Sequence, residues 1–114
     1  MKPSELTIKP WGEFRQFTLN QESTIKTLTI NFGEILSLQT HTTREEYWYV
    51  LEGHPKITLG NEVFDASPGQ EIFVTQGQKH RIAASLDTVV ILEIAYGHFD
   101  EEDIVRLEDK YNRS

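Results

Sequence analysis

Four side chains of this 114-residue chain have the types and the spacing of a metal site. Gln39 and His41 are two residues apart in a segment predicted as a β-strand, so their side chains point to the same face. Glu46 follows after a short polar loop, and His80 begins a distant predicted strand after a turn that contains Gly77. Two imidazoles, a carboxylate and an amide oxygen suit one divalent ion, with zinc as our first choice and manganese, cobalt, nickel or iron as alternatives.

Each of these residues, taken alone, also has an ordinary structural explanation. A histidine at a strand end is usually a hydrogen-bonding surface residue, and a single Glu or Gln is usually solvated. The joint spacing of the four favours the metal site. His54 and His98 do not fit this spacing and are interpreted as exposed or loop histidines. The chain contains no cysteine, which excludes disulfides and thiolate ligands.

The composition limits the classes of function. The formal net charge of −7 argues against nucleic-acid binding, which requires a basic surface. A phosphate-bearing substrate would therefore need local cations, and the candidates are Arg44, Lys79, Arg81 and Arg106. No apolar run approaches the roughly 20 residues of a membrane helix. The first residues contain no apolar signal region, so we expect a cytoplasmic protein that does not enter membranes.

Short strands separated by turns must position the candidate ligands. Gly60 and Asn61 form a two-residue hairpin signal, and the pattern on both sides of them is typical of small all-β proteins. Strands are predicted at residues 24–32, 35–41, 46–51, 56–59, 62–65, 71–75, 80–84 and 88–96.

Only the tail has a helical pattern. Asp100 is a suitable helix cap, and an apolar stripe follows it at Ile104, Leu107 and Tyr111. We therefore predict one domain, with an N-terminal arm at residues 1–23, an all-β barrel at 24–99, and a short C-terminal helix and tail at 100–114.

The glycines around the candidate ligands complete two motifs that resemble those of the cupin superfamily. The first cupin motif places a Gly, five residues, His-x-His, three or four residues, a Glu, six residues and a Gly. At these spacings this chain has Gly33, Gln39, His41, Glu46 and Gly53. The second motif places a Gly, five residues, Pro-x-Gly, two residues and a His, and it is matched by Gly69, Thr75, Gly77 and His80. The resemblance implies a single jelly-roll barrel, also called a double-stranded β-helix, that holds the four ligands in its interior.

Further motifs are similar to the C-terminal cupin domain of type II mannose-6-phosphate isomerases, which is often fused behind a mannose-1-phosphate guanylyltransferase. That family has Leu-Ser-Leu-Gln, then Arg-x-Glu-x-Trp, and this chain has them at residues 36–39 and 44–48. The family's Pro-Trp-Gly and its acidic tail motif are matched at 10–12 and 101–111. The departures are Thr42, Thr43 and Tyr47, where the family usually carries His, and Lys79, where it usually carries Pro.

The resemblance implies a metal-dependent enzyme that isomerises mannose 6-phosphate to fructose 6-phosphate. In that reaction a metal ion stabilises the enediolate, and Arg44 is our candidate for catalytic contact with the phosphate or the enediolate. Arg81 and Arg106 are the second candidates for substrate binding. The resemblance also implies a homodimer. Two alternatives remain open: a non-catalytic sugar- or metabolite-binding cupin, and another metal-dependent cupin enzyme.

Overall fold

The protein is described by a computed structural model that places residues 4–111. These residues form an all-β fold, as the sequence predicts, and contain no helix that could cross a membrane. The strands are β1 (Glu5–Lys9), β2 (Gly12–Gln16), β3 (Ser23–Ile30), β4 (Leu38–Thr40), β5 (Glu45–Glu52), β6 (Lys56–Leu59), β7 (Glu62–Asp65), β8 (Glu71–Val74), β9 (His80–Ala83), β10 (Val89–Tyr96) and β11 (Val105–Glu108).

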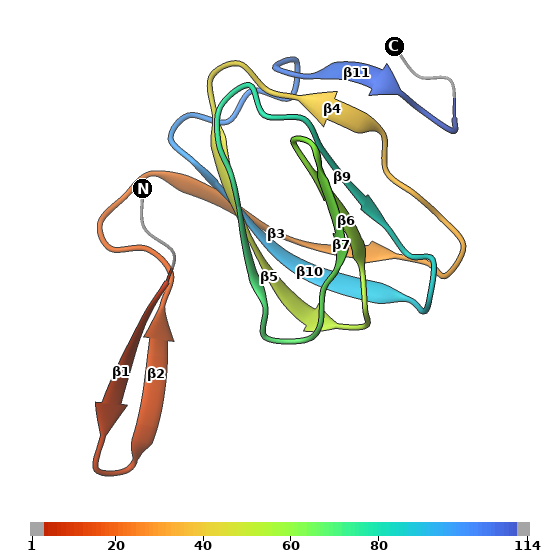
Figure 1. Cartoon of the computed structure of the whole chain (residues 1–114). Coiled ribbons are helices and arrows are strands. Elements are labelled where there is room, and N and C mark those ends of the chain that lie inside the picture. Colours follow the sequence, from red (N-terminus) through yellow and green to blue (C-terminus); the bar gives the residue numbers. More distant parts are fainter. Residues whose placement is uncertain (1–3, 112–114) are drawn as a thin grey trace.

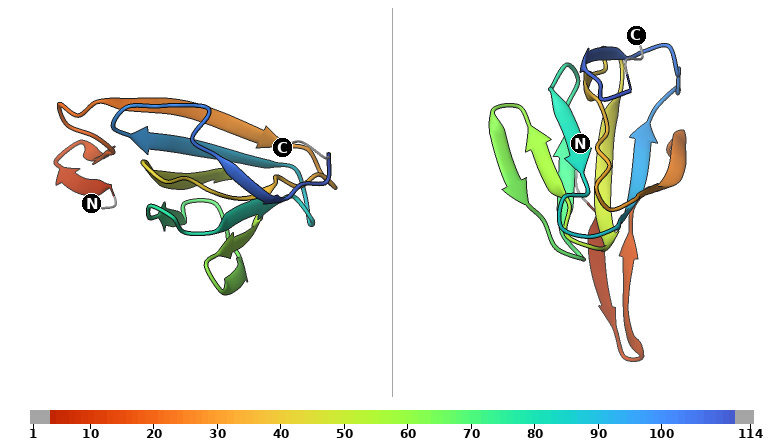
Figure 2. Two further views of the ribbon diagram at one scale, coloured as in Figure 1. Left: turned by 90° about the horizontal axis from the view of Figure 1, so that it is seen from above. Right: turned by 90° about the vertical axis from the view of Figure 1, so that its right-hand side faces the viewer.

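Two antiparallel sheets face each other and form the barrel (Figures 1 and 2). One sheet has the strand order β3-β10-β5-β8, and the other has the order β11-β4-β9-β6-β7. The predicted hairpin signal is confirmed, because Gly60 and Asn61 connect β6 to β7 and Gly60 has a φ of 61°. A positive φ of this size suits glycine, which has no Cβ to clash with the backbone.

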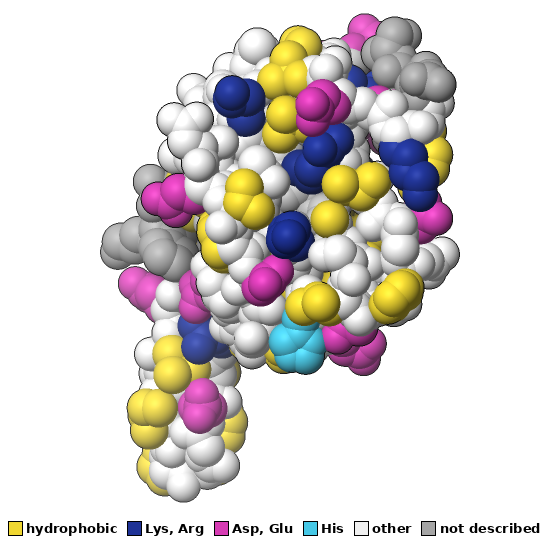
Figure 3. Space-filling view, turned by 45° about the vertical axis from the view of Figure 1, so that its right-hand side comes forward, with side chains coloured by type: hydrophobic (Ala, Val, Ile, Leu, Met, Phe, Trp, Pro, Cys, Tyr) yellow, Lys and Arg dark blue, Asp and Glu magenta, His cyan; other side chains and the backbone are white. Residues whose placement is uncertain are grey.

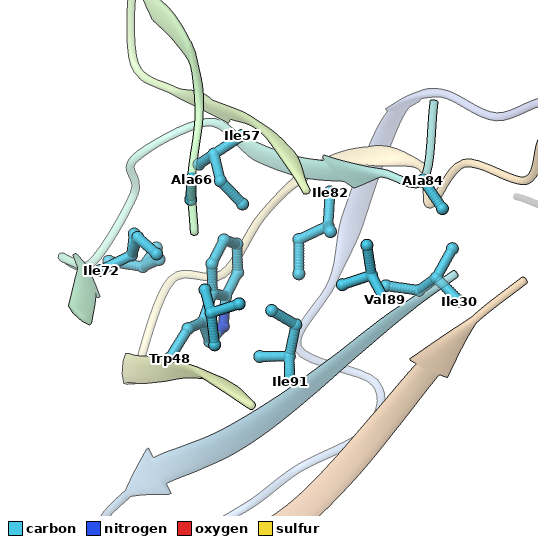
Figure 4. Packing of buried hydrophobic residues seen from close by; sticks show 11 residues of the cluster. Ile30, Trp48, Ile57, Ala66, Ile72, Ile82, Ala84, Val89 and Ile91 are labelled. Carbon is cyan, nitrogen blue, oxygen red and sulfur yellow. The ribbon is translucent and has the colours of Figure 1, made fainter. Parts of the chain in front are cut away.

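The apolar core fills the space between the sheets (Figure 4). Ile57 and Ile82 enter it from one sheet, and Val50 and Ile91 enter it from the other; all four are fully buried. Trp48 forms the boundary between this core and the polar interior. It packs in the apolar cluster, and its Nε1 donates a hydrogen bond of 3.2 Å to a carboxylate oxygen of Glu46.

The predicted C-terminal helix is wrong. Within the tail, residues 105–108 form strand β11, which pairs with the edge of β4 through Val105 opposite Thr40 and Arg106 opposite Gln39. The unpaired backbone groups of a short edge strand favour such pairing, and this outweighed the apolar stripe. Asp100 caps a turn instead of a helix, since its side chain accepts a 3.0 Å hydrogen bond from the amide of Glu102. Residues 112–114 of the predicted tail lie outside the described part of the chain.

The N-terminal arm contains a hairpin that projects away from the barrel (Figure 1). Strands β1 and β2 pair with each other, with Lys9 opposite Gly12 at the turn. Ile8 and Trp11 are 71% and 72% exposed, so the hairpin presents apolar side chains to solvent. Residues 1–3 of the predicted arm lie outside the described range.

Candidate metal centre

The fold brings three of the four predicted ligands together in the barrel interior. His41 follows β4, Glu46 lies on β5 of the opposite sheet, and His80 begins β9. Their side chains are 1–2% exposed, and one possible ligand atom of each lies within 4.8 Å of the others. The Nε2 atoms of His41 and His80 lie 3.4 and 3.8 Å from the two carboxylate oxygens of Glu46.

Hydrogen bonds to the backbone orient both imidazoles toward this cluster. The Nδ1 of His41 lies 2.6 Å from the carbonyl oxygen of Asp103, and the Nδ1 of His80 lies 2.9 Å from that of Gln78. A carbonyl oxygen only accepts, so each Nδ1 carries the hydrogen and each Nε2 keeps its lone pair. Burial lowers the pKa of His80, which favours the neutral form that binds metals. The donor set therefore fits one divalent ion.

Gln39, the fourth predicted ligand, lies beside the cluster. It pairs with His80 in the register of β4 and β9, and its Nε2 lies 3.4 Å from the Nε2 of His80. Its Oε1 accepts a 2.9 Å hydrogen bond from the hydroxyl of Ser37 and so faces away from the cluster. A half-turn of the amide would bring the oxygen to the position of the nitrogen.

Arg44 contacts the same atoms that a metal ion would use. Its Nε donates to Oε2 of Glu46 at 2.9 Å, and its Nη2 lies 3.1 Å from the Nε2 of His41. The guanidinium is buried and its Cζ lies 4.5 Å from the centroid of the Phe99 ring. In this structure Arg44 therefore supplies the cation that balances the charge of Glu46.

Glu93, on the inner face of β10, is a functional candidate that the sequence reasoning missed. Burial and the neighbouring charge of Glu46 raise the pKa of Glu93 to about 8, and the two carboxyl groups are hydrogen-bonded. Burial acts to raise the pKa of Glu46 as well, but His80, His41, Glu93 and Arg44 together lower it below its usual value. The signal was the alternation of β10, in which Glu93 has the same parity as Val89 and Ile91.

A cavity of about 190 Å³ opens beside the cluster. It is lined by Lys26, Leu28, Leu36, Ser37, Gln39, Arg44, Trp48, His80, Arg81, Ile82, Glu93 and Arg106. Four of these side chains are cationic, although the chain carries a net charge of −7. The space-filling view shows several Lys and Arg side chains on the visible face of the barrel, with Asp and Glu side chains among them (Figure 3).

The predicted substrate-binding arginines differ in their contacts. Arg81 lines the cavity, but its Nε donates to the carbonyl of Leu36 at 3.0 Å and its Nη1 to a carboxylate oxygen of Glu108 at 3.1 Å. The bond to Glu108 joins β9 to β11, and the bond to Leu36 joins β9 to the segment before β4. Arg106 lines the cavity from β11, whereas Lys79 is exposed and does not line it.

The two remaining histidines lie where the sequence placed them, outside the cluster. His54 is 52% exposed and its Nδ1 lies 2.7 Å from a carboxylate oxygen of Asp87. His98 is also exposed. Neither residue lines the cavity.

Comparison with known proteins identifies relatives along nearly the whole chain. The family model described as mannose-6-phosphate isomerase C-terminal matches residues 2–109. The xanthan biosynthesis protein XanB of Xanthomonas campestris pv. campestris is 33% identical over 108 residues, which are 93% of this chain and 23% of that protein. The mannose-1-phosphate guanylyltransferase of Salmonella montevideo is 31% identical over 110 residues, with the same coverage of 93% and 23%. The chain thus spans less than a quarter of the length of these curated relatives.

The fold also matches solved structures. The capsular polysaccharide assembling protein CapF of Staphylococcus aureus superposes with a TM-score of 0.67 and 18% identity. The match covers 95% of this chain and 33% of that one. The predicted cupin barrel is confirmed, without the C-terminal helix.

Proposed function

The chain belongs to the family of mannose-6-phosphate isomerase C-terminal domains, and we propose that it is itself a metal-dependent isomerase of mannose 6-phosphate and fructose 6-phosphate. The observation that carries this proposal is the buried cluster of His41, Glu46 and His80 at the wall of a cavity lined by cationic side chains. Aldose–ketose isomerisation needs charge stabilisation next to a binding site for a phosphate ester. The cluster and the cavity together supply both.

The candidate ligands come from both sheets of the barrel. His41, Glu46 and His80 would hold one divalent ion, with Gln39 as a fourth ligand after its amide turns. Zinc is the first candidate, and manganese, cobalt, nickel or iron are the alternatives. When bound, the ion supplies a Lewis acid for the oxygens of the substrate.

Arg44 would contact the anionic substrate or the enediolate. Arg44 lines the cavity, and its guanidinium also lies over the ring of Phe99. Arg106 would bind the substrate from β11, and Arg81 would contribute from β9 while it keeps that strand tied to the tail.

We further propose that the chain forms a homodimer through its N-terminal hairpin. An isolated two-stranded hairpin is at best marginally stable in water. The exposed side chains of Ile8 and Trp11 therefore favour burial against a second copy.

The test is metal analysis of the purified protein, followed by an isomerase assay on mannose 6-phosphate. Wild type should contain one divalent ion per chain and form fructose 6-phosphate. The variant with both His41→Ala and His80→Ala should lose more than about 100-fold in metal affinity and lose activity, since it lacks two ligands. His54→Ala is the matched control, because His54 is exposed and outside the cluster, and it should behave as wild type.

Two results would contradict the proposal. One is isomerase activity that survives complete removal of the metal. The other is metal-loaded wild type that binds mannose 6-phosphate but never converts it, which would favour the non-catalytic sugar-binding function.

A further inference from the structure

Lys26 is a cavity-lining cation that neither the motifs nor the metal cluster explain. It lies on β3 with Glu93 as its register partner on β10, and its side chain is half-buried on the inner side of the sheet. Its Nζ lies 4.2 Å from the centroid of the Phe99 ring. Lys26 therefore reaches the cavity from the sheet opposite to β4, β9 and β11.

The charge of Lys26 has no carboxylate partner within salt-bridge distance in the described part of the chain. Its register partner Glu93 is instead hydrogen-bonded to Glu46. A lysine on the inner face of a barrel usually pairs with an acid or extends to water, because its charge is costly to desolvate. Here the ammonium group lies over the aromatic ring of Phe99, and such a contact compensates only part of the cost. Its charge also acts on the carboxyl group of Glu93 and opposes the rise in the pKa of that group, without forming a salt bridge.

Phe99 also places a second cation nearby. The Cζ of Arg44 lies 4.5 Å from the same ring centroid, so this atom and the Nζ of Lys26 are at most about 8.7 Å apart. Arg106 lines the same cavity from the opposite sheet. A small anion between the sheets would therefore meet positive charge from both sides.

We propose that Lys26, together with Arg106, forms the subsite for the phosphoryl group of the sugar phosphate. This inference rests on the proposed function for the identity of the ligand and adds the residue that selects a phosphorylated sugar over a free sugar. The cavity continues to Gln39 and His80, so the other end of the same ligand would reach the metal cluster. Its volume of about 190 Å³ is below the ~300–1,000 Å³ of pockets for drug-sized ligands, as suits a monosaccharide.

The experiment is calorimetric titration of metal-loaded protein with mannose 6-phosphate, with free mannose and with inorganic phosphate. Lys26→Met keeps a side chain of similar length and removes the charge. It should weaken binding of mannose 6-phosphate by about 10- to 100-fold, leave binding of free mannose unchanged and leave metal content unchanged. Lys26→Arg should recover part of the loss. Lys56→Met is the control, because Lys56 is exposed on β6 and does not line the cavity.

The outcomes separate the subsite from the isomerase activity. If Lys26→Met weakens the binding of both sugars equally, or of neither, the subsite is refuted even when wild type is an active isomerase. If wild type binds mannose 6-phosphate through Lys26 and does not convert it, the subsite stands and the isomerase proposal fails. Circular dichroism of each variant verifies that the barrel is folded.

Discussion

Replacement of Arg44 by Gln should increase the affinity of the protein for a divalent ion. The Nε2 of His41 has one lone pair, and Arg44 lies within hydrogen-bonding distance of it at 3.1 Å. Arg44 also donates to Glu46 at 2.9 Å. An ion bound to these two atoms therefore requires the guanidinium to leave them, so wild type must break existing contacts before it binds metal.

The magnitude follows from those two contacts. Hydrogen bonds that involve a charged group each contribute about 1.5–3 kcal/mol, so Arg44 gives up roughly 3–6 kcal/mol in gross terms. Part of this free energy is recovered when the released guanidinium is solvated or contacts substrate. We therefore expect Arg44→Gln to bind the metal about 10- to 100-fold more tightly, which corresponds to roughly 1.4–2.8 kcal/mol.

The assay is competition between the protein and a chromophoric chelator for Zn²⁺, with Arg81→Gln as the control. Arg81 carries the same charge, but its hydrogen bonds go to Leu36 and Glu108 and not to the cluster. In the same Arg44→Gln variant, kcat/KM should fall by about 100- to 1,000-fold, because one ionic contact to the transition state is lost. Equal or weaker metal binding by the variant would refute the reasoning and would mean that Arg44 supports the ligands instead of competing with the ion.

Two further predictions concern the loop and the hairpin. Asp103→Ala removes a carboxylate that accepts four hydrogen bonds from the loop after β4. The variant should bind the metal about 10- to 100-fold more weakly in the same chelator assay. Asp65→Ala is the control, because Asp65 is exposed on β7, and it should leave metal binding unchanged. Light scattering at micromolar concentration should show a dimer for wild type and a monomer for the Ile8→Ser, Trp11→Ser double variant; a monomeric wild type, or a similar effect from Leu86→Ser, would count against the hairpin interface.

The sequence predicted the barrel better than it predicted the ends of the chain. The limits of β6 and β7 agree with the predicted segments 56–59 and 62–65, because a short glycine turn between alternating residues fixes the register. Residues 1–23 were predicted only as an N-terminal arm, and the two paired strands within it were not predicted.

The candidate site was also predicted only in part. The spacing of His41, Glu46 and His80 was sufficient to predict that these three side chains come together, whereas Gln39 lies beside them on the strand next to that of His80. The side-chain partners were not predictable. Lys26 and Glu93 are inward-facing charges whose role depends on what lies across the barrel, and the contacts of Arg44 with His41 and Glu46 depend on the burial of all three side chains.

The same hydrogen bonds explain why the tail is not helical and what Thr42 and Thr43 contribute. The hydroxyl and amide groups of Thr42 and Thr43 all donate to the carboxylate of Asp103, at 2.6–2.9 Å, which lowers the pKa of that carboxyl. This anchor holds the carbonyl of Asp103 against the Nδ1 of His41. In a helix that carbonyl would accept the amide of Leu107, four residues on, and would be unavailable to His41. The tail therefore helps to orient the candidate ligand His41 only because it is not helical. The two threonines supply the contacts that keep it there.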